Sequence, residues 1–150
     1  MAIPEHIEIF KKGPQYWNAW RDKNPDIRPD LSDINFEEDV QSYGSVYDLP
    51  EFNGYNLSFM NLNRISARNS YFMNCSLAGS DINFSDICFS FFQNCNFEKA
   101  SLAVTKIGSA EFHQCDLSPR FKTMTLMRFK INYGICRSQN EKTLQRRTNL

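Results

Sequence analysis

The chain has 150 residues, of which 41% are hydrophobic and 23% charged, and its formal net charge is zero. This length and composition are typical of one globular domain rather than a disordered chain. No apolar run reaches the roughly eighteen residues of a membrane-spanning helix, and the first residues lack the apolar core of a secretory signal. The odd number of five cysteines argues against a secreted disulfide framework. We therefore expect a cytoplasmic protein without a membrane span.

Charge is distributed unevenly along the chain. Residues 22–51 contain nine acidic and two basic residues, a net charge of −7, whereas residues 119–150 carry +7 and residues 52–118 only −1. A basic segment of this kind can contact nucleic acid or an anionic membrane surface. We favour a solvated or capping tail instead, which pairs with the acidic segment of the same or another subunit.

Residues 1–28 are expected to form a helical cap of two short helices. Gly13 ends the first helix, Pro14 suits the first turn of the second, and Pro25 ends it. The apolar faces are predicted to consist of Ile3, Ile7 and Phe10 in the first helix and of Tyr16, Trp17 and Trp20 in the second.

Residues 29–49 are expected to lead into a repeat. Leu31 and Phe36 begin a five-residue rhythm that is one register away from the rhythm that follows. We expect an initial coil here, followed by a loop near residues 37–49 that shifts the phase. This loop is the best candidate for a variable interaction element, although we favour a plain insertion.

From Phe52 onward every fifth residue is apolar, over fourteen consecutive steps. We call this position i. Its members are Phe52, Leu57, Leu62, Ala67, Phe72, Leu77, Ile82, Ile87, Phe92, Phe97, Leu102, Ile107, Phe112 and Leu117. Position i−2 is small from Ser70 onward, and includes Cys75, Cys95 and Cys115.

A five-residue period fits neither a straight helix nor a straight strand. Five helical residues advance about 500°, so the apolar stripe drifts, and an odd period in a strand sends successive side chains to opposite faces. The pattern therefore predicts a chain that turns every five residues and points i and i−2 inward. Positions i+1 and i+2 form the corners, where turn-forming pairs such as Asn53-Gly54 occur.

A second period of twenty residues predicts four segments per coil. The columns formed by Phe52, Phe72, Phe92 and Phe112, and by Leu57, Leu77, Phe97 and Leu117, repeat at this spacing. Stacked coils of this kind form a solenoid whose stability comes from contacts between neighbouring coils.

The stretches SLAGSDINFSDICF, CNFEKASL and YNLSFMNLN resemble the A(D/N)LxX repeats of pentapeptide-repeat proteins. The resemblance covers about residues 29–118, and the upstream GPQYWNAWRDKNPDIRPDLS resembles a leader found before such arrays in many bacterial members. It implies an all-β fold, a right-handed quadrilateral β-helix of about 3.5 to 5 coils, with i and i−2 inside. We place this β-helix at residues 29–119. Residues 120–150 are expected to contain a degenerate coil or capping strand and a basic tail.

The three evenly spaced cysteines are predicted to be core residues rather than a reactive or metal-binding site. Four zinc ligands must converge on one point, whereas Cys75, Cys95 and Cys115 are expected in a straight column and point the same way. Parallel side chains also disfavour disulfides. Cys88 should be a more exposed corner residue, and Cys136 lies outside the repeat.

No catalytic or cofactor motif occurs in the chain. His113 is expected at a corner, with neither a nucleophile nor an orienting acid at a motif spacing. A filled interior also leaves no pocket for a small-molecule substrate. We therefore expect no enzyme activity, no cofactor and no metal.

The expected function is a non-enzymatic protein–protein interaction module of unknown partner, which binds through its outer faces or through loop 37–49. The alternative is a DNA mimic that binds DNA gyrase or topoisomerase IV, as some pentapeptide-repeat proteins do. Mimicry needs an acidic rod, and residues 52–118 are nearly neutral. A secreted bacterial effector is a third reading, and a homodimer through a terminal coil is left open.

Overall fold

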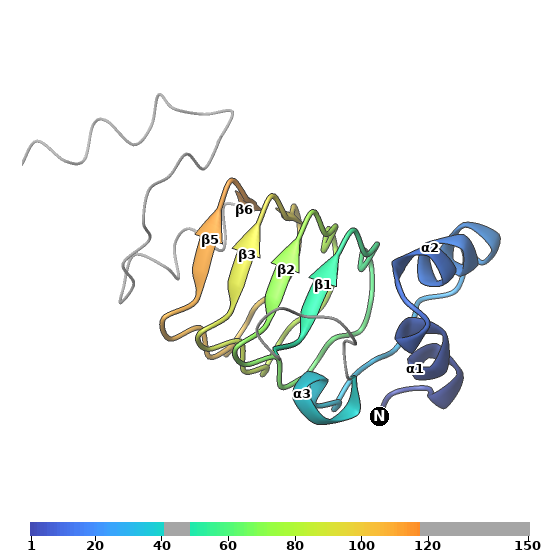
Figure 1. Cartoon of the computed structure of the whole chain (residues 1–150), viewed down its shortest axis with the longest axis horizontal. Coiled ribbons are helices and arrows are strands. Elements are labelled where there is room, and N and C mark those ends of the chain that lie inside the picture. Colours follow the sequence, from blue (N-terminus) through green and yellow to red (C-terminus); the bar gives the residue numbers. More distant parts are fainter. Residues whose placement is uncertain (41–48, 118–150) are drawn as a thin grey trace, which may run out of the picture.

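The computed structural model describes residues 1–40 and 49–117. In this part the chain is mainly β with parallel strand pairing, and two helices lie at its N-terminal end (Figure 1). The coil, capping strand and basic tail predicted for residues 120–150, Cys136, and most of the predicted loop lie outside the described residues.

Four short strands form one parallel sheet, and a two-stranded sheet lies beside it. The four-stranded sheet has the order β1 (Glu51–Asn53), β2 (Tyr71–Met73), β3 (Phe91–Gln93) and β5 (Glu111–His113), and β4 (Asn96–Phe97) pairs with β6 (Asp116–Leu117). In each pair the partners are twenty residues apart, as in Phe52 with Phe72 and Phe97 with Leu117.

Isolated parallel bridges extend this offset to four ladders. Besides the Phe52 ladder, they join Asn56, Ser76 and Asn96; Asn61, Asp81 and Ser101; and Ser66, Asp86 and Lys106. We call the twenty residues that pass once through all four ladders a level, so that level 1 is residues 50–69, level 2 is 70–89 and level 3 is 90–109. Backbone hydrogen bonds join the levels, for example from Leu57 N to Ser76 O at 2.7 Å.

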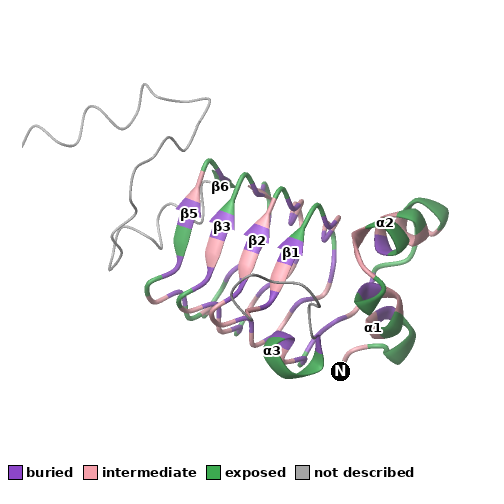
Figure 2. Ribbon diagram, viewed as in Figure 1, coloured by how far each residue is buried: buried purple, intermediate pink, exposed green. Residues whose placement is uncertain are grey.

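The side chains at position i fill the interior of the levels. All fourteen are buried, and Figure 2 shows buried and exposed positions alternating along each level. The rings of Phe52, Phe72, Phe92 and Phe112 stack with centroids 4.8, 4.8 and 4.9 Å apart. Burial of this continuous apolar column is the main source of stability, because each short strand alone buries too little.

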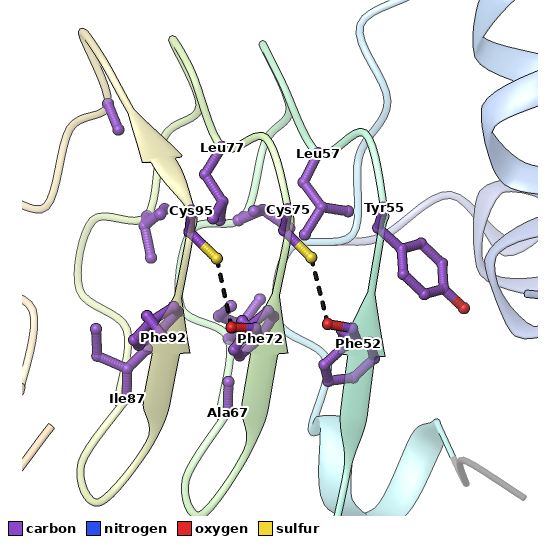
Figure 3. Close-up of a cluster of buried hydrophobic side chains, with 14 of the residues drawn as sticks. Phe52, Tyr55, Leu57, Ala67, Phe72, Cys75, Leu77, Ile87, Phe92 and Cys95 are labelled. Carbon is purple, nitrogen blue, oxygen red and sulfur yellow. Dashed lines mark hydrogen bonds between the residues drawn. The ribbon is translucent and has the colours of Figure 1, made fainter. Parts of the chain in front are cut away.

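Position i−2 provides a hydrogen-bond donor as well as a small side chain. The Ser85 hydroxyl donates to the Leu62 carbonyl of the level below at 3.0 Å. The cysteines do the same: Cys75 Sγ lies 3.3 Å from Phe52 O, and Cys95 Sγ lies 3.4 Å from Phe72 O (Figure 3). This explains why Ser and Cys are frequent at i−2, since each donor satisfies a buried carbonyl at a corner.

Two helices, α1 (Pro4–Lys11) and α2 (Pro14–Lys23), begin with proline in their first turn and lie against level 1. Phe10 and Trp17 are fully buried, and Trp17 Nε1 donates to Asn56 O at 2.8 Å. Beside them, burial raises the pKa of Tyr55 to about 12, so its hydroxyl stays neutral. The helices thereby cover apolar residues at the N-terminal end of the repeat.

The predicted apolar faces of these helices need correction at two residues. Tyr16 is largely exposed and Ile3 is also exposed, while Trp20 is half-buried and packs against His6. Ile3 precedes α1 rather than lying within it. In α1 the buried face is His6 and Phe10, because the His6 ring accepts a hydrogen bond from Asp30 N and so is satisfied inside.

The lead-in segment, residues 29–40, joins the ladders with a different offset. Asp30 pairs with Asn61 and Asn35 with Ser66, which are 31 residues apart instead of twenty. Where the sequence predicts the start of a loop, the structure has a short helix, α3 (Phe36–Asp39). The Asn35 side chain accepts a hydrogen bond from Glu37 N and so caps this helix.

We predict that Trp17→Ala lowers the free energy of unfolding by about 3 to 5 kcal/mol, because it removes a fully buried ring and leaves a cavity. Tyr16→Ala is the control on the same helix and should change it by less than about 0.5 kcal/mol. Urea denaturation followed by fluorescence and circular dichroism measures both. Equal effects of the two substitutions would contradict the capping role of α2.

We also predict that Ser85→Ala costs about 1 to 2 kcal/mol, because the Leu62 carbonyl is left without its donor. Ser85→Cys is the matched control, since cysteine occupies position i−2 in a neighbouring wall, where Cys75 Sγ contacts the carbonyl of Phe52, and it should cost less. The comparison uses chemical denaturation at neutral pH under reducing conditions. A Ser85→Ala variant as stable as the parent chain would show that the donor is dispensable.

Candidate interaction surface

The interior offers no room for a ligand. Its core contains a cavity of about 10 Å³, which is lined by apolar side chains of position i together with Phe36 and Ile65. A cavity of this size holds at most one water, and an apolar one stays dry. Chemistry or recognition in the described residues must therefore use the outer surface.

The predicted cysteine column lies inside this core. Cys75, Cys95 and Cys115 are buried, and each sulfur lies within hydrogen-bond distance of two backbone carbonyls. The neighbouring thiols of Cys115 and Cys75, together with burial, raise the pKa of Cys95, whereas the Cys95 thiol lowers the pKa of Cys75 and of Cys115. All three sulfurs are buried, so the column presents no accessible nucleophile. Cys88, predicted at a corner, is half-buried and is not part of a disulfide.

His113 lies on the outer face of the four-stranded sheet. Its Nε2 is 2.9 Å from Glu111 Oε2, and its ring centroid is 4.7 Å from that of Phe91. The structure thus provides an acid beside this histidine, which the sequence analysis did not expect. Within residues 1–40 and 49–117, however, no hydroxyl or thiol is hydrogen-bonded to the His113 ring. The pair alone does not make a nucleophilic site.

The described residues contain no group of three or more His, Cys, Asp or Glu side chains arranged to hold a metal ion. None of the helices in this part of the chain is long and apolar enough to cross a membrane.

The corners of the levels have a left-handed backbone. Position i+2 has a positive φ at thirteen consecutive steps, from Gly54 at 74° to Gln114 at 52°. Glycine and asparagine tolerate this conformation, whereas other residues pay roughly 1 to 2 kcal/mol for it. Asp and Asn at i−1 stabilise the corner through hydrogen bonds to its backbone. For example, the Asp86 side chain accepts a hydrogen bond from Cys88 N at 3.1 Å. The corner side chain itself points away from the core.

Four corners carry large apolar side chains that are mostly exposed. The exposed fractions are 63% for Phe59, 62% for Phe84, 56% for Phe89 and 68% for Val104. These residues strain the backbone and expose apolar area to water, so the isolated chain gains little from them. Such residues mark the surface where a partner would gain most from binding.

Three of the four corner residues border one wall of the structure, the Ser66 ladder. Phe84 and Phe89 flank Asp86 at level 2, and Val104 precedes Lys106 at level 3. Arg68 of level 1 reaches up to this wall: its Nη1 lies 2.9 Å from Asp86 Oδ2, and its guanidinium lies 5.3 Å from the Phe89 ring centroid. The ion pair with Asp86 and the cation–π contact with Phe89 therefore hold Arg68 between the aromatic corners.

The corner residues were not recognised from the sequence as candidates. Apolar residues at i and i−2 have a structural explanation, whereas i+2 was expected only to hold turn formers. The same five-residue step places Phe59, Phe84, Phe89 and Val104 at i+2. Large apolar residues at i+2, where a turn favours glycine or asparagine, are the sequence signal that identifies them.

A scan against protein-family models gives no match for this chain, and a search of curated proteins likewise finds none.

We predict that Val104→Asn raises the free energy of unfolding by about 0.5 to 1 kcal/mol, because asparagine tolerates a left-handed backbone better than a β-branched residue does. Ile27→Asn is the control at another exposed apolar residue, which lacks a positive φ, and it should bring no gain. Thermal and urea denaturation measure both. A clear loss of stability in Val104→Asn would contradict the corner strain.

Proposed function

We propose that the chain is a pentapeptide-repeat protein whose repeat forms a right-handed quadrilateral β-helix and acts as a non-enzymatic protein–protein interaction module. The five-residue step of buried side chains and the four ladders with a twenty-residue offset support this fold. The resemblance to A(D/N)LxX repeats supports the family. The packed interior supports a role in binding through outer surfaces rather than in catalysis.

The observation that carries the proposal is the set of exposed apolar corner residues. A left-handed corner without a further role favours glycine or asparagine, as at Gly54, Asn74 and Asn94. Phe59, Phe84, Phe89 and Val104 instead combine backbone strain with exposed apolar area. Retaining such residues is the pattern expected of a binding surface, where aromatic side chains contribute most of the affinity.

The distribution of charge supports a protein partner over DNA mimicry. The repeat region 52–118 carries a net charge of −1, and two of its acids are paired with arginines, Asp81 with Arg28 and Asp86 with Arg68. A surface that replaces DNA must present a strong and continuous negative potential.

The test compares affinity capture by the whole chain with capture by a variant in which the four apolar corners are replaced by asparagine. We expect a specific protein to be captured by the parent chain and lost from the variant, which should be at least as stable as the parent. A parallel DNA gyrase assay should show neither inhibition of supercoiling nor protection from inhibitors. Identical capture by both chains, or an effect on gyrase, would contradict the proposal.

A further inference from the structure

The wall that contains the Ser66 ladder has opposite charges at its two ends. We call this wall the Ser66 face; it consists of Asn35, Ser66, Asp86 and Lys106 with the corners beside them. At the lower end, α3 begins directly after Asn35 and presents the exposed side chains of Glu37 and Glu38. At the upper end Lys106 is exposed. Among the described residues these three charges have no ion-pair partner.

The middle of the Ser66 face combines arginines at level 1 with aromatic corners at level 2. Arg64 pairs with Asp33, whose pKa is held well below its usual range by Arg64 and by the N-terminal amine at 3.1 Å. Arg68 pairs with Asp86. Both arginines are nevertheless substantially exposed along their side chains, and one level above them Phe84 and Phe89 are more than half exposed.

A twofold axis placed between levels 1 and 2 would make this face complementary to itself. An antiparallel second copy would place its Lys106 opposite α3 and its own α3 opposite Lys106. The same rotation sets Phe84 and Phe89 of each copy against the arginine side chains of the other. Aromatic rings pack well on guanidinium groups and on the aliphatic parts of arginine, and both contacts occur twice, as an isologous interface requires.

The floor between the aromatic corners allows close approach of another wall. The outward residues at i+1 above Arg68 are small: Cys88 is half-buried at level 2, and Gly108 follows at level 3. A Cβ added at Gly108 would lie 3.4 Å from Cys88 Sγ, so the two stack directly. The face is therefore flat, with the corner rings as its main projections.

We propose that the Ser66 face binds a second copy of this chain, in an antiparallel twofold dimer whose central contacts are Phe84 and Phe89. This inference rests on the proposed function, in which the corner residues make the binding contacts, and it identifies their partner as a second copy of the chain. The four rungs from Asn35 to Lys106, at about 4.8 Å each, give a face about 19 Å tall, and a five-residue wall is at most about 17 Å wide. The face therefore measures roughly 300 Å², less than the about 800 Å² per partner of a stable interface. We therefore expect a weak dimer, with a dissociation constant in the micromolar range.

The first test measures mass by sedimentation velocity over protein concentrations from about 5 to 500 μM, using the full chain under reducing conditions. We expect a monomer–dimer equilibrium in the parent chain and a monomer throughout in the Phe84→Asn/Phe89→Asn variant. Asparagine suits the left-handed backbone, so the loss of the dimer should accompany unchanged or higher thermal stability. Phe59→Asn is the matched control, because its corner does not border the Ser66 face, and it should dimerise like the parent.

The second test reverses the end charges. Lys106→Glu should weaken the dimer about tenfold or more at low salt, since it places like charges opposite each other. Adding Glu37→Lys and Glu38→Lys to the same chain should restore dimerisation, because both ends of the twofold contact are then inverted together. Higher salt should reduce the effect of each change.

Three outcomes would overturn the dimer: a parent chain that stays monomeric at every concentration, a dimer unaffected by Phe84→Asn/Phe89→Asn, or a Lys106→Glu defect that the α3 reversals do not repair. A dimer unaffected by the aromatic replacements would place the contact elsewhere, for example at a terminal coil. A monomeric parent whose captured protein is still lost from the four-corner variant would reject the second copy but keep the proposed function. A monomeric parent chain whose captured proteins are the same as those of the four-corner variant would reject both the dimer and the proposed function.

Discussion

The backbone turns at a left-handed residue once in every five, and the rest of the repeat depends on this turn. A chain restricted to extended geometry would run straight and send its odd-numbered apolar residues to alternate faces. The left-handed corner redirects the chain while keeping its amide in the ladder, as where Phe84 N donates to Ala103 O at 2.9 Å. Burial of the i column and the hydrogen bonds between levels offset the strain at each corner.

The same turn separates structural positions from positions open to recognition. Side chains at i and i−2 must fill the interior and satisfy its carbonyls, so they have little freedom to vary. A corner side chain leaves the core, and its only structural requirement is tolerance of a positive φ. Phe84, Phe89 and Val104 do not meet this requirement well. Their presence at the border of one wall, beside paired arginines, is why we assign binding to the corners.

The periodic part of the fold could be predicted from the sequence because similar residue types recur every five and every twenty positions. A large apolar residue every five positions locates the interior, and phenylalanines at 52, 72, 92 and 112 give the size of a level. Four features could not be predicted. The change of phase near residues 37–49 was expected, but the 31-residue offset at Asp30 and Asn35 and the helix α3 have no counterpart in either period. The donor role of Ser85 and the surface role of Phe89 depend on side-chain surroundings that a period does not describe.

The claim that the twenty-residue level is the structural unit is tested most directly by deletion. Removing residues 76–95 joins Cys75 to Asn96 and should leave every ladder in register with one level fewer. Removing residues 76–93 deletes almost as many residues but breaks both periods. Circular dichroism during urea titration should show cooperative unfolding with a lower midpoint for the twenty-residue deletion, and loss of a cooperative transition for the eighteen-residue deletion. Indistinguishable unfolding of the two chains would contradict the account.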